Sequence, residues 1–308
     1  MRLATLRSSG GSRVALAAGE AWVDVAGAAA ALLGDRDCPT TLVGLLRRDG
    51  PGLGTAARLV EALAAAPSLP VVPAERARLG PPAEGAGAFL DFYAFEEHVR
   101  GARARRGLEV PPEWYRYPVY YRSNQRAFLG HGDEVHFPAG EDRMDYELEL
   151  AAVLGAPLSS PSAGQATAAI AGYCLLNDWS ARTIQAEVVK VGLGPARGKD
   201  FATSLGPWLV TADELGDPGR LTLEARVNGE RWSRGRVGEM RWSFGELIAF
   251  AGDGVRFEPG DVFGSGTLGG GCGLELGRFL SVGDIVELDG GPTLGALANT
   301  VRQREGQR

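Results

Sequence analysis

The stretch DYELEL at residues 145–150 decides most about the fold of this 308-residue chain. Glu147 and Glu149 stand two positions apart in an apolar run that continues to Leu154. Successive side chains of a β-strand point to opposite faces, so a strand here would place both carboxylates side by side on one face. The spacing alone leaves open an alternative, in which the strand is solvated and both acids face outward.

Two carboxylates on one face of a strand have to be compensated if that strand is buried. Like charges repel at short range, and an unpaired buried charge costs much free energy. A hard divalent cation removes both difficulties, because carboxylate oxygens are ligands that Mg²⁺ and Ca²⁺ prefer. A buried strand over these residues therefore predicts a metal site whose further ligands come from elsewhere in the chain.

A third acid, Asp178, follows an apolar stretch. It could be the N-cap of a helix predicted over residues 180–189, since Asp is favoured there, or it could be a third carboxylate ligand. In that helix Arg182 and Gln185 would lie on roughly one face. Lys199 follows a glycine-rich loop, and lysine is scarce in this chain, so general surface composition does not explain it.

Composition excludes several classes of protein. The net charge is -6, and no run of Lys and Arg resembles a binding stripe, so we expect no nucleic-acid partner. The Arg-rich segment at residues 100–106 is interpreted as a solvated helix face rather than a phosphate site. No N-terminal apolar segment and no run of about 18 apolar residues indicates a membrane anchor. We therefore expect a cytoplasmic protein.

The cysteines support the same expectation about the compartment. Cys38, Cys174 and Cys272 are odd in number, widely spaced and without a Cys-x-x-Cys pair. This pattern predicts neither a disulfide framework nor a zinc site, and it fits a reducing environment.

Turn-forming residues divide the chain into two predicted parts. The stretch at residues 79–85 is rich in Gly and Pro, which places a boundary near residue 85. We predict a small N-terminal accessory domain at residues 1–85 and a larger domain at residues 86–308. Within the larger part, residues 221–227 alternate and are followed by Asn228-Gly229, a strong hairpin signal.

Few helical patterns interrupt this β-rich sequence, so the predicted class is α+β with β-structure dominant. Another strand is expected at residues 285–288. The predicted helices cover residues 40–47, 54–66, 95–106, 180–189 and 243–251. No GxGxxG motif opens a helix after a strand, and the glycine-rich stretch at residues 264–277 lacks the Lys-Ser/Thr of a P-loop. A nucleotide-binding fold is therefore not expected.

Several short segments between residues 85 and 290 occur together in one order. They are Asp91-Phe92-Tyr93 with His98, residues 145–149, residues 177–185, Gly198-Lys199, Gly206-Pro207-Trp208, residues 264–267 and Leu274-Glu275-Leu276. Each segment alone is modest, but the ordered set resembles the fumarylacetoacetate hydrolase family. The first 80 residues match only weakly.

The resemblance implies a fold, an assembly and a metal site. The fold would be a large mixed β-roll or sandwich whose opening holds the metal, preceded by the small N-terminal domain, and the common assembly is a homodimer. The ion would be Mg²⁺ or Ca²⁺, with Mn²⁺ as a further candidate. By analogy its ligands would be Asp91, Glu147, Glu149 and Asp178.

The resemblance also implies a reaction, the hydrolysis of a C–C bond in a 1,3-diketo acid through a metal-bound enolate. His98, oriented by Glu275, would activate water, because a carboxylate behind an imidazole raises its basicity. Lys199, Arg182 and Gln185 would stabilise the developing oxyanion and the substrate carboxylate. The positions that match substrate contacts in the family are Tyr93, Tyr121, Arg182 and Thr267.

Departures from the family pattern leave the substrate open. Tyr121 is followed by Arg122-Ser123-Asn124, where the family's namesake has His-Gly-Arg, and residues 186–190 carry no aromatic side chain. Fumarylacetoacetate, fumarylpyruvate and simple acylpyruvates are all candidates for the dicarbonyl acid.

Other reactions can use the same kind of site. The family also contains isomerases, decarboxylases and dehydratases of related 2-keto acids, for which Glu96 and Glu97 could act as an acid/base pair. These two acids could equally be exposed at a helix N-terminus, where the helix dipole favours negative charge. A non-catalytic metal-binding protein would be expected to lack His98, Glu275 or Lys199, and all three are present.

Overall fold

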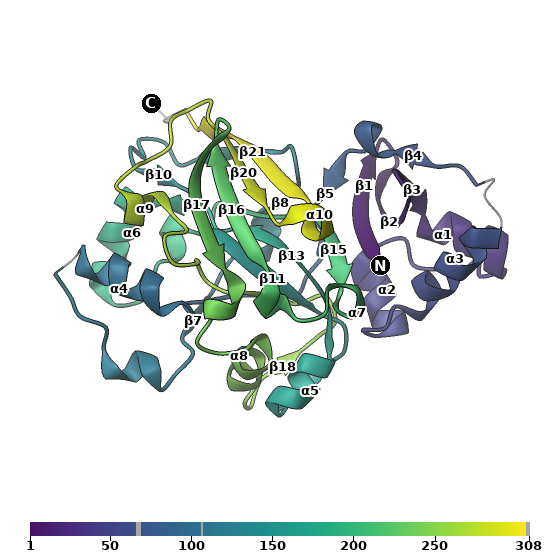
Figure 1. The fold of residues 1–308 in the computed structure, drawn as a ribbon, viewed down its shortest axis with the longest axis horizontal. Helices are drawn as coiled ribbons and strands as arrows, with labels where there is room; N and C mark the ends of the chain where they lie inside the picture. The colour runs from purple at the N-terminus through teal and green to yellow at the C-terminus, as the bar shows by residue number, and fades with distance from the viewer. Residues whose placement is uncertain (66–68, 106, 306–308) are drawn as a thin grey trace.

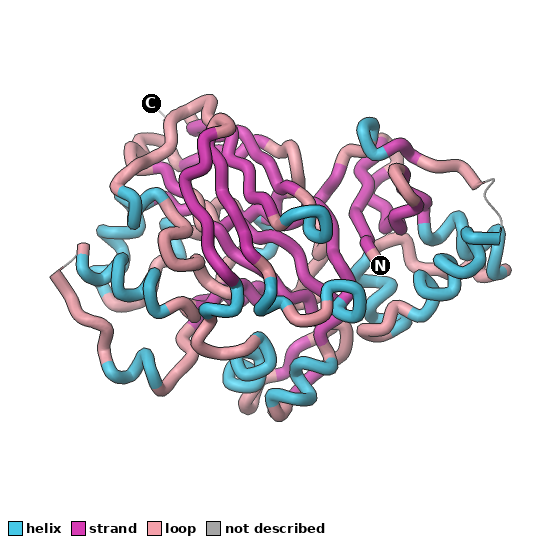
Figure 2. The backbone as a smooth tube through the Cα atoms, viewed as in Figure 1, coloured by secondary structure: helices cyan, strands magenta, loops and turns pink. Residues whose placement is uncertain are grey.

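The computed structural model describes residues 1–65, 69–105 and 107–305. Figure 1 shows a small N-terminal α+β part on the right and a larger β-rich body on the left. Figure 2 shows that strands fill the middle of the larger body, while helices and loops lie around them. The predicted class, α+β with β-structure dominant, is therefore confirmed.

The larger of the two main sheets runs through the whole molecule. Within the described residues it has twelve strands, in the order β4-β3-β2-β1-β15-β13-β11-β19-β6-β7, with β5 beside β1 and β8 beside β15. Its strands are β1 (Arg2–Ser8), β2 (Gly11–Ala18), β3 (Ala21–Asp24), β4 (Val72–Pro73), β5 (Leu79–Gly80), β6 (Phe89–Phe92), β7 (Tyr120–Arg122), β8 (Phe128–Leu129), β11 (Leu148–Leu154), β13 (Ile170–Asn177), β15 (Thr203–Thr211) and β19 (Val262–Gly264).

The second main sheet, in the order β17-β16-β20-β21-β9, packs on the larger one. Its strands are β9 (Glu134–Phe137), β16 (Thr222–Val227), β17 (Glu230–Arg236), β20 (Ile285–Asp289) and β21 (Ala296–Gln303). Two short pairs complete the described strands, β10 (Met144–Asp145) with β14 (Ser180–Ala181) and β12 (Leu158–Ser159) with β18 (Arg256–Phe257).

The predicted hairpin between β16 and β17 is confirmed. Val227 pairs with Glu230, and the two residues between them both have positive φ, 51° at Asn228 and 82° at Gly229. A two-residue turn of this kind matches the right-handed twist of the strands, which explains why Asn-Gly is a strong hairpin signal.

The helices are short and lie at the edges of the sheets (Figure 1). The α-helices are α1 (Val25–Ala28), α2 (Leu42–Asp49), α3 (Gly54–Ala65), α4 (Glu96–Ala104), α5 (Ala163–Ala168), α6 (Arg182–Val188), α7 (Ala212–Leu215), α8 (Phe244–Ala251), α9 (Gly273–Leu276) and α10 (Gly291–Leu294). The 3₁₀ and π segments are η1 (Ala29–Leu33), η2 (Ala74–Arg76), η3 (Pro112–Tyr115), η4 (Gln125–Ala127), η5 (Val189–Val191), η6 (Ala196–Gly198), η7 (Pro218–Arg220) and η8 (Val237–Glu239).

The predicted helices agree with α2, α3, α4, α6 and α8, with differences at their ends. The helix expected from residue 180 begins at Arg182, because residues 180–181 form β14 instead. Residues 66 and 106, the expected ends of two helices, lie outside the described residues. None of the helices within the described ranges is long and apolar enough to cross a membrane.

The central strand β11 separates two apolar cores. Its residues at positions 148, 150, 152 and 154 belong to the core between the two main sheets. Ala151 and Val153, on the opposite face, belong to the core that contains the N-terminal helices. All seven residues of β11 are buried, so a charged side chain on either face is removed from water.

The N-terminal part continues the larger sheet instead of standing apart from it. In the pairing of β1 with β15, Arg2 lies opposite Val210 and Leu3 opposite Leu209. On α2, Leu45 and Leu46 are fully buried in the core on this side of the sheet. The boundary near residue 85 stays a prediction about domain organisation.

Candidate active site

Strand register brings acids from distant parts of the chain to one face of the larger sheet. In parallel pairing, Asp91 of β6 lies opposite Gly264 of β19, and Gly264 lies opposite Ala151 of β11. Residues directly opposite one another have side chains on the same face, as do residues two apart in one strand. Asp91 and Glu149 therefore point into the same space.

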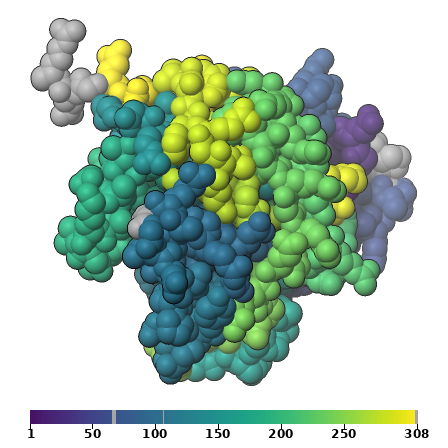
Figure 3. Space-filling view, turned by 60° about the vertical axis from the view of Figure 1, so that its left-hand side comes forward, coloured from purple at the N-terminus to yellow at the C-terminus, as the bar shows by residue number. Residues whose placement is uncertain are grey.

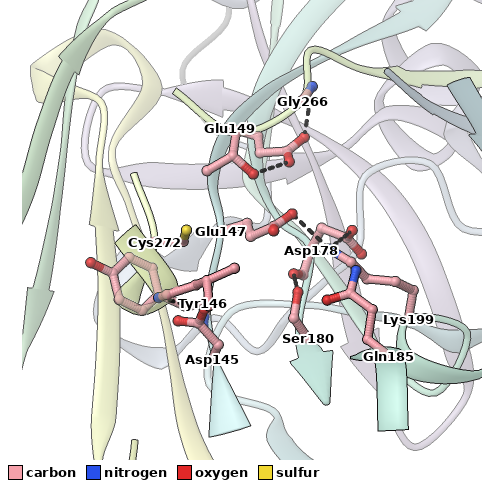
Figure 4. A network of polar contacts seen from close by, with 12 residues as sticks. Asp145, Tyr146, Glu147, Glu149, Asp178, Ser180, Gln185, Lys199, Gly266 and Cys272 are labelled. Atoms are coloured by element: carbon pink, nitrogen blue, oxygen red, sulfur yellow. Dashed lines mark hydrogen bonds and ion pairs between the residues drawn. The ribbon is translucent and has the colours of Figure 1, made fainter. Parts of the chain in front are cut away.

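The other two acids meet where β11 and β13 adjoin. Leu148 lies opposite Asn177, so the residues next to them, Glu147 and Asp178, are neighbours as well. Carboxylate oxygens of Asp91, Glu147, Glu149 and Asp178 all lie within 4.8 Å of one another. Figure 4 shows the side chain of Glu149 above that of Glu147, two positions earlier in the chain. The structure thus brings together all four carboxylates that the sequence predicted as metal ligands.

These four carboxylates fit a cation. All are buried, with Glu149 and Asp178 fully inaccessible to solvent. Burial raises the pKa of Asp91 and Glu149 well above the usual range, and repulsion from neighbouring carboxylates raises both further. Asp91 Oδ1 is buried without a hydrogen-bond partner. An oxygen-only set of this kind, with one buried oxygen that lacks a hydrogen-bond partner, suits a hard divalent ion.

Gly264 leaves the room that this cluster needs. A Cβ atom on that residue would lie 2.3 Å from Asp91 Oδ1 and 3.2 Å from Glu149 Oε2. Any side chain at position 264 would therefore push into the space between the carboxylates.

Lys199 supplies positive charge on one side of the cluster. Its Nζ donates hydrogen bonds of 2.6 Å to Glu147 Oε2 and 2.6 Å to Asp178 Oδ2 (Figure 4). Burial would raise the pKa of Glu147, but attraction to Lys199 and Arg182 outweighs burial and holds it below the usual range. The pKa of Lys199 is correspondingly raised, because Asp178 and Glu147 offset its own burial.

Arg182 is held by internal acceptors. Its guanidinium donates to Asp145 Oδ2 at 2.7 Å, to Glu147 Oε1 at 2.7 Å and to Gln185 Oε1 at 3.0 Å. Three of its nitrogens are thereby engaged within the protein, so in this structure Arg182 acts first as a support for Glu147.

Asp145 is a residue that the sequence reasoning left without a role. It is fully buried, pairs with Arg182, and accepts hydrogen bonds from the backbone N–H of Gly273 at 2.7 Å and of Leu274 at 3.0 Å. The sequence did contain a sign of this role, because Asp145 stands two positions before Glu147 in the same alternating stretch.

His98 and Glu275 form the pair that was predicted. His98 Nδ1 lies 2.7 Å from Glu275 Oε2 although the residues are 177 positions apart in sequence. Burial alone would raise the pKa of Glu275, but the contact with His98 and a hydrogen bond from Gly270 N–H lower it below the usual value. Cys272, which carried no prediction here, donates its thiol proton to the same carboxylate oxygen over 3.3 Å.

The glycine-rich loop lets backbone groups reach the site acids. Gly266 N donates to Glu149 Oε2 at 3.1 Å, as Figure 4 shows. Gly270 N donates to Glu275 Oε1 at 3.2 Å, and Gly266 has a φ of 79°, which favours glycine. The stretch thus contacts carboxylates rather than a phosphate.

A cavity of about 270 Å³ opens over this cluster. The predicted site residues that line it are Asp91, Tyr93, His98, Tyr121, Glu147, Arg182, Gln185, Lys199 and Thr267. The other three stand behind this lining and hold it by hydrogen bonds: Glu149 accepts from Thr267 Oγ1 at 3.3 Å, Asp178 from the Tyr121 hydroxyl, and Glu275 pairs with His98.

These contacts bear on two alternatives that the sequence left open. Asp178 does not cap α6. In the first turn of this helix, the backbone N–H groups of Thr183 and Ile184 donate instead to the Glu141 carboxylate, at 3.0 and 3.1 Å. Glu96, proposed as a second acid/base, accepts from the Tyr115 hydroxyl at 2.8 Å and pairs with Arg100.

Glu97 lies with Glu96 in a separate surface hollow, which Gly269 and Arg100 also line. The described part of the chain therefore shows neither acid in the cavity that His98 lines. This placement favours the interpretation of Glu96 and Glu97 as acids at a helix N-terminus.

Buried acids that could hold a cation, set beside a His–Glu pair in a β-rich fold, define the class as an enzyme with an acidic metal site. Residues 88–302 match the family model described as fumarylacetoacetate (FAA) hydrolase C-terminal. The chain belongs to the fumarylacetoacetate hydrolase family.

Relatives in this family are named as hydrolases. A protein of Burkholderia multivorans, named only as a hydrolase, is 34% identical over 226 residues, which cover 72% of this chain and 76% of its own. A 2,4-didehydro-3-deoxy-L-rhamnonate hydrolase of Sphingomonas sp. (strain SKA58) is 33% identical over 237 residues, which cover 74% of this chain and 80% of the relative.

Solved structures agree with the fold over the full length. A protein of Mycobacterium smegmatis described as HpcE has a TM-score of 0.80 and 27% identity, covering 99% of this chain and 100% of its own. Maleylpyruvate hydrolase of Sphingobium sp. SYK-6, solved with manganese(II) and pyruvate, has a TM-score of 0.73 and 23% identity at the same coverage.

Proposed function

We propose that this protein is a metal-dependent hydrolase that cleaves a C–C bond in a 1,3-diketo acid. The observation that carries the proposal is the 2.7 Å contact between His98 Nδ1 and Glu275, at the wall of the cavity that Asp91 and Glu147 also line. A histidine held by a carboxylate is suited to take a proton from water, which a hydrolase needs.

The His–Glu pair determines which ring nitrogen receives that proton. Nδ1 of His98 is engaged by Glu275 Oε2, so Nε2 is the nitrogen left to accept a proton. Glu275 then stabilises the imidazolium that forms, as the carboxylate does in other His–carboxylate pairs. His98 is only 4% exposed, so bulk water competes little with the bound substrate for this nitrogen.

The overall reaction adds one water across the bond between C3 and C4 of a 2,4-dioxo acid. The oxygen of water attacks the C4 carbonyl, the C3–C4 bond breaks, and its electron pair leaves on C3 as an enolate. The proton taken by His98 returns to C3. The products are a carboxylic acid from the C4 side and a 2-keto acid from the C3 side.

Charge on the leaving fragment has to be stabilised. A divalent cation held by Asp91, Glu147, Glu149 and Asp178 would supply Lewis-acid stabilisation of negative oxygen when bound. Lys199, which is 3% exposed and holds two of these acids, adds a fixed positive charge at the cavity wall. Mg²⁺, Ca²⁺ and Mn²⁺ all suit oxygen ligands.

The relatives support this choice of substrate class. The 2,4-didehydro-3-deoxy acid in the name of the Sphingomonas enzyme is a 2,4-dioxo acid. Maleylpyruvate is another, and the Sphingobium enzyme was solved with pyruvate and a divalent ion.

The test is ultraviolet turnover of a panel of 2,4-dioxo acids with Mn²⁺, with Mg²⁺ and with EDTA. We expect metal-dependent cleavage of at least one of them, and a fall of about a hundredfold or more in His98→Gln. His136→Gln is the matched control, because His136 is exposed on β9 and should keep full activity. Proton exchange at C3 without cleavage would instead indicate an isomerase at this site, and release of CO2 would indicate a decarboxylase.

A further inference from the structure

A second hollow adjoins the catalytic cavity and is lined by positive side chains. This hollow, of about 760 Å³, is reached over side chains that line both cavities, namely Ala102, Arg182, Gln185, Val189 and Leu274. Its other charged lining residues are Arg105, Arg143 and Lys190, which define what we term the basic vestibule. Among the described residues, no Asp or Glu lines it.

The vestibule cations come from three separate elements. Arg105 caps the end of α4, Arg143 precedes β10, and Lys190 lies in η5 directly after α6. Figure 1 places α4 and α6 at the end of the molecule away from the N-terminal part. Figure 3 turns this end forward, so that the blue segment near residue 100 and the teal segment near residue 190 face the reader. One arginine of the Arg-rich segment, Arg105, thus lines a hollow beside the catalytic cavity.

Two of these cations have no carboxylate partner in the described residues. Arg105 donates to the backbone carbonyl of Glu275 at 2.5 Å, and the Arg143 guanidinium lies 4.5 Å from the centre of the Phe279 ring. Neither contact neutralises charge. Arg143 is half-buried, so its guanidinium is held in place by the ring while its nitrogens stay available for an anion.

Arg182 and Lys190, the other cations that line the hollow, differ from this pair because each has a carboxylate partner. Arg182 is already balanced by Asp145 and Glu147. Lys190 forms a 2.7 Å ion pair with Glu187, but both side chains are mostly exposed, at 65% and 70%. Such surface pairs contribute little and exchange readily for another anion.

We propose that the substrate is a diacid, in which the acyl group beyond C4 ends in a second carboxylate that binds Arg105 and Arg143. This inference rests on the proposed function, because it places the reacting dicarbonyl end at the four-carboxylate cluster. From there the acyl chain of the substrate would pass the residues that line both cavities, and its terminal carboxylate would lie in the vestibule. Arginine forks bind carboxylates in bidentate geometry, and uncompensated cations in a hollow concentrate anions.

The positive charge of the vestibule also contrasts with the negative net charge of the molecule. The chain carries a net charge of -6, so its overall charge repels an anionic substrate at long range. A local excess of positive charge at the entrance to the site offsets that repulsion for the ligand that has to enter. A neutral acyl tail would gain nothing from it.

Binding of uncleavable 2-keto acids tests the inference without turnover. Calorimetry would compare 2-oxoadipate with 2-oxohexanoate, and 2-oxopimelate with 2-oxoheptanoate, each pair equal in carbon number and differing in the terminal group. These acids lack the second carbonyl, so they cannot be cleaved at C3–C4. With Mn²⁺ present we expect at least one diacid to bind about fivefold to tenfold tighter than its matched monoacid.

Variants then assign the preference to the vestibule. Arg143→Gln and Arg105→Gln should each remove most of the diacid preference and leave monoacid affinity within about twofold. Arg220→Gln is the control, because the side chain of Arg220, in η7, is 87% exposed and does not line the hollow. Rising salt should weaken the diacid more than the monoacid.

The outcomes separate this inference from the proposed function. Equal affinity of diacid and monoacid at both lengths, in the wild-type protein, would overturn the diacid inference even if a neutral acylpyruvate is cleaved. A diacid preference that the Arg variants do not change would overturn it as well. If no 2,4-dioxo acid is cleaved, the proposed function fails, and the binding comparison still decides what the vestibule recognises.

Discussion

At the residue scale, acids that look alike in the sequence differ in pKa because of the cations beside them. Asp91 and Glu149, buried among carboxylates, have pKa values well above the usual range. Glu147 contacts both Lys199 and Arg182, and its pKa lies below that range despite burial. Charge compensation by two cations therefore keeps one acid ionised before any metal binds.

Glu275→Gln tests the orientation of His98. The substitution keeps the shape of the side chain but removes the charge that stabilises the imidazolium, so we expect kcat to fall about tenfold to a hundredfold. Metal affinity should not change, because Glu275 is not among the four clustered acids. The measurement is steady-state kinetics with Mn²⁺ titration, and Glu20→Gln, an exposed acid between β2 and β3, is the control. Unchanged kcat would remove Glu275 from the mechanism.

At the scale of elements, the pairing of β19 with its two neighbouring strands positions the acids of the metal site. This short strand lies between β6 and β11, and its last residue, Gly264, faces the acids of both. Parallel and antiparallel pairings on its two sides align Asp91 with Ala151, so the metal site depends on the register of three strands.

Gly264→Ala tests this dependence. The new methyl group would lie 2.3 Å from Asp91 Oδ1, so the carboxylate must move, and we expect metal affinity to fall by about tenfold or more. Gly164→Ala in α5 is the matched control, because its Cβ meets no atom within 4 Å. That change should leave metal binding intact and raise helix stability by about 0.5–1 kcal/mol. Calorimetric metal titration and thermal unfolding measure both effects, and equal metal affinity in the two variants would contradict the prediction.

The stability of the whole molecule should depend on the metal. Four buried carboxylates lie within 4.8 Å of one another, and Lys199 and Arg182 compensate only part of their negative charge. An ion that binds only the folded state stabilises it, by about 2.7 kcal/mol at a free concentration about a hundredfold above Kd.

We therefore expect the Tm to rise by a few degrees on adding Mn²⁺ or Mg²⁺ to protein treated with EDTA. In an Asp91→Asn, Glu149→Gln double variant the rise should vanish, while the metal-free Tm should be equal to or above that of the wild type, since repulsion is removed. Differential scanning calorimetry measures both values. A metal-independent Tm in the wild-type protein would argue against a cation at these acids.

The sequence by itself determined the local patterns. Alternation in residues 145–150 predicted that Glu147 and Glu149 share a face, and Asn228-Gly229 predicted the hairpin, because both depend only on backbone geometry between near neighbours. The ordered motifs also led to the family and hence to the overall fold, which the match over residues 88–302 confirms.

Only the tertiary structure decided what each polar group contacts. His98 meets Glu275 across 177 positions, and Arg182 turns to Asp145 and Glu147, because sheet register and loop packing set these distances. The basic vestibule likewise joins Arg105, Arg143 and Lys190, which are far apart in the sequence. Charge complementarity acts through space over a few ångströms, and separation along the chain carries no information about it.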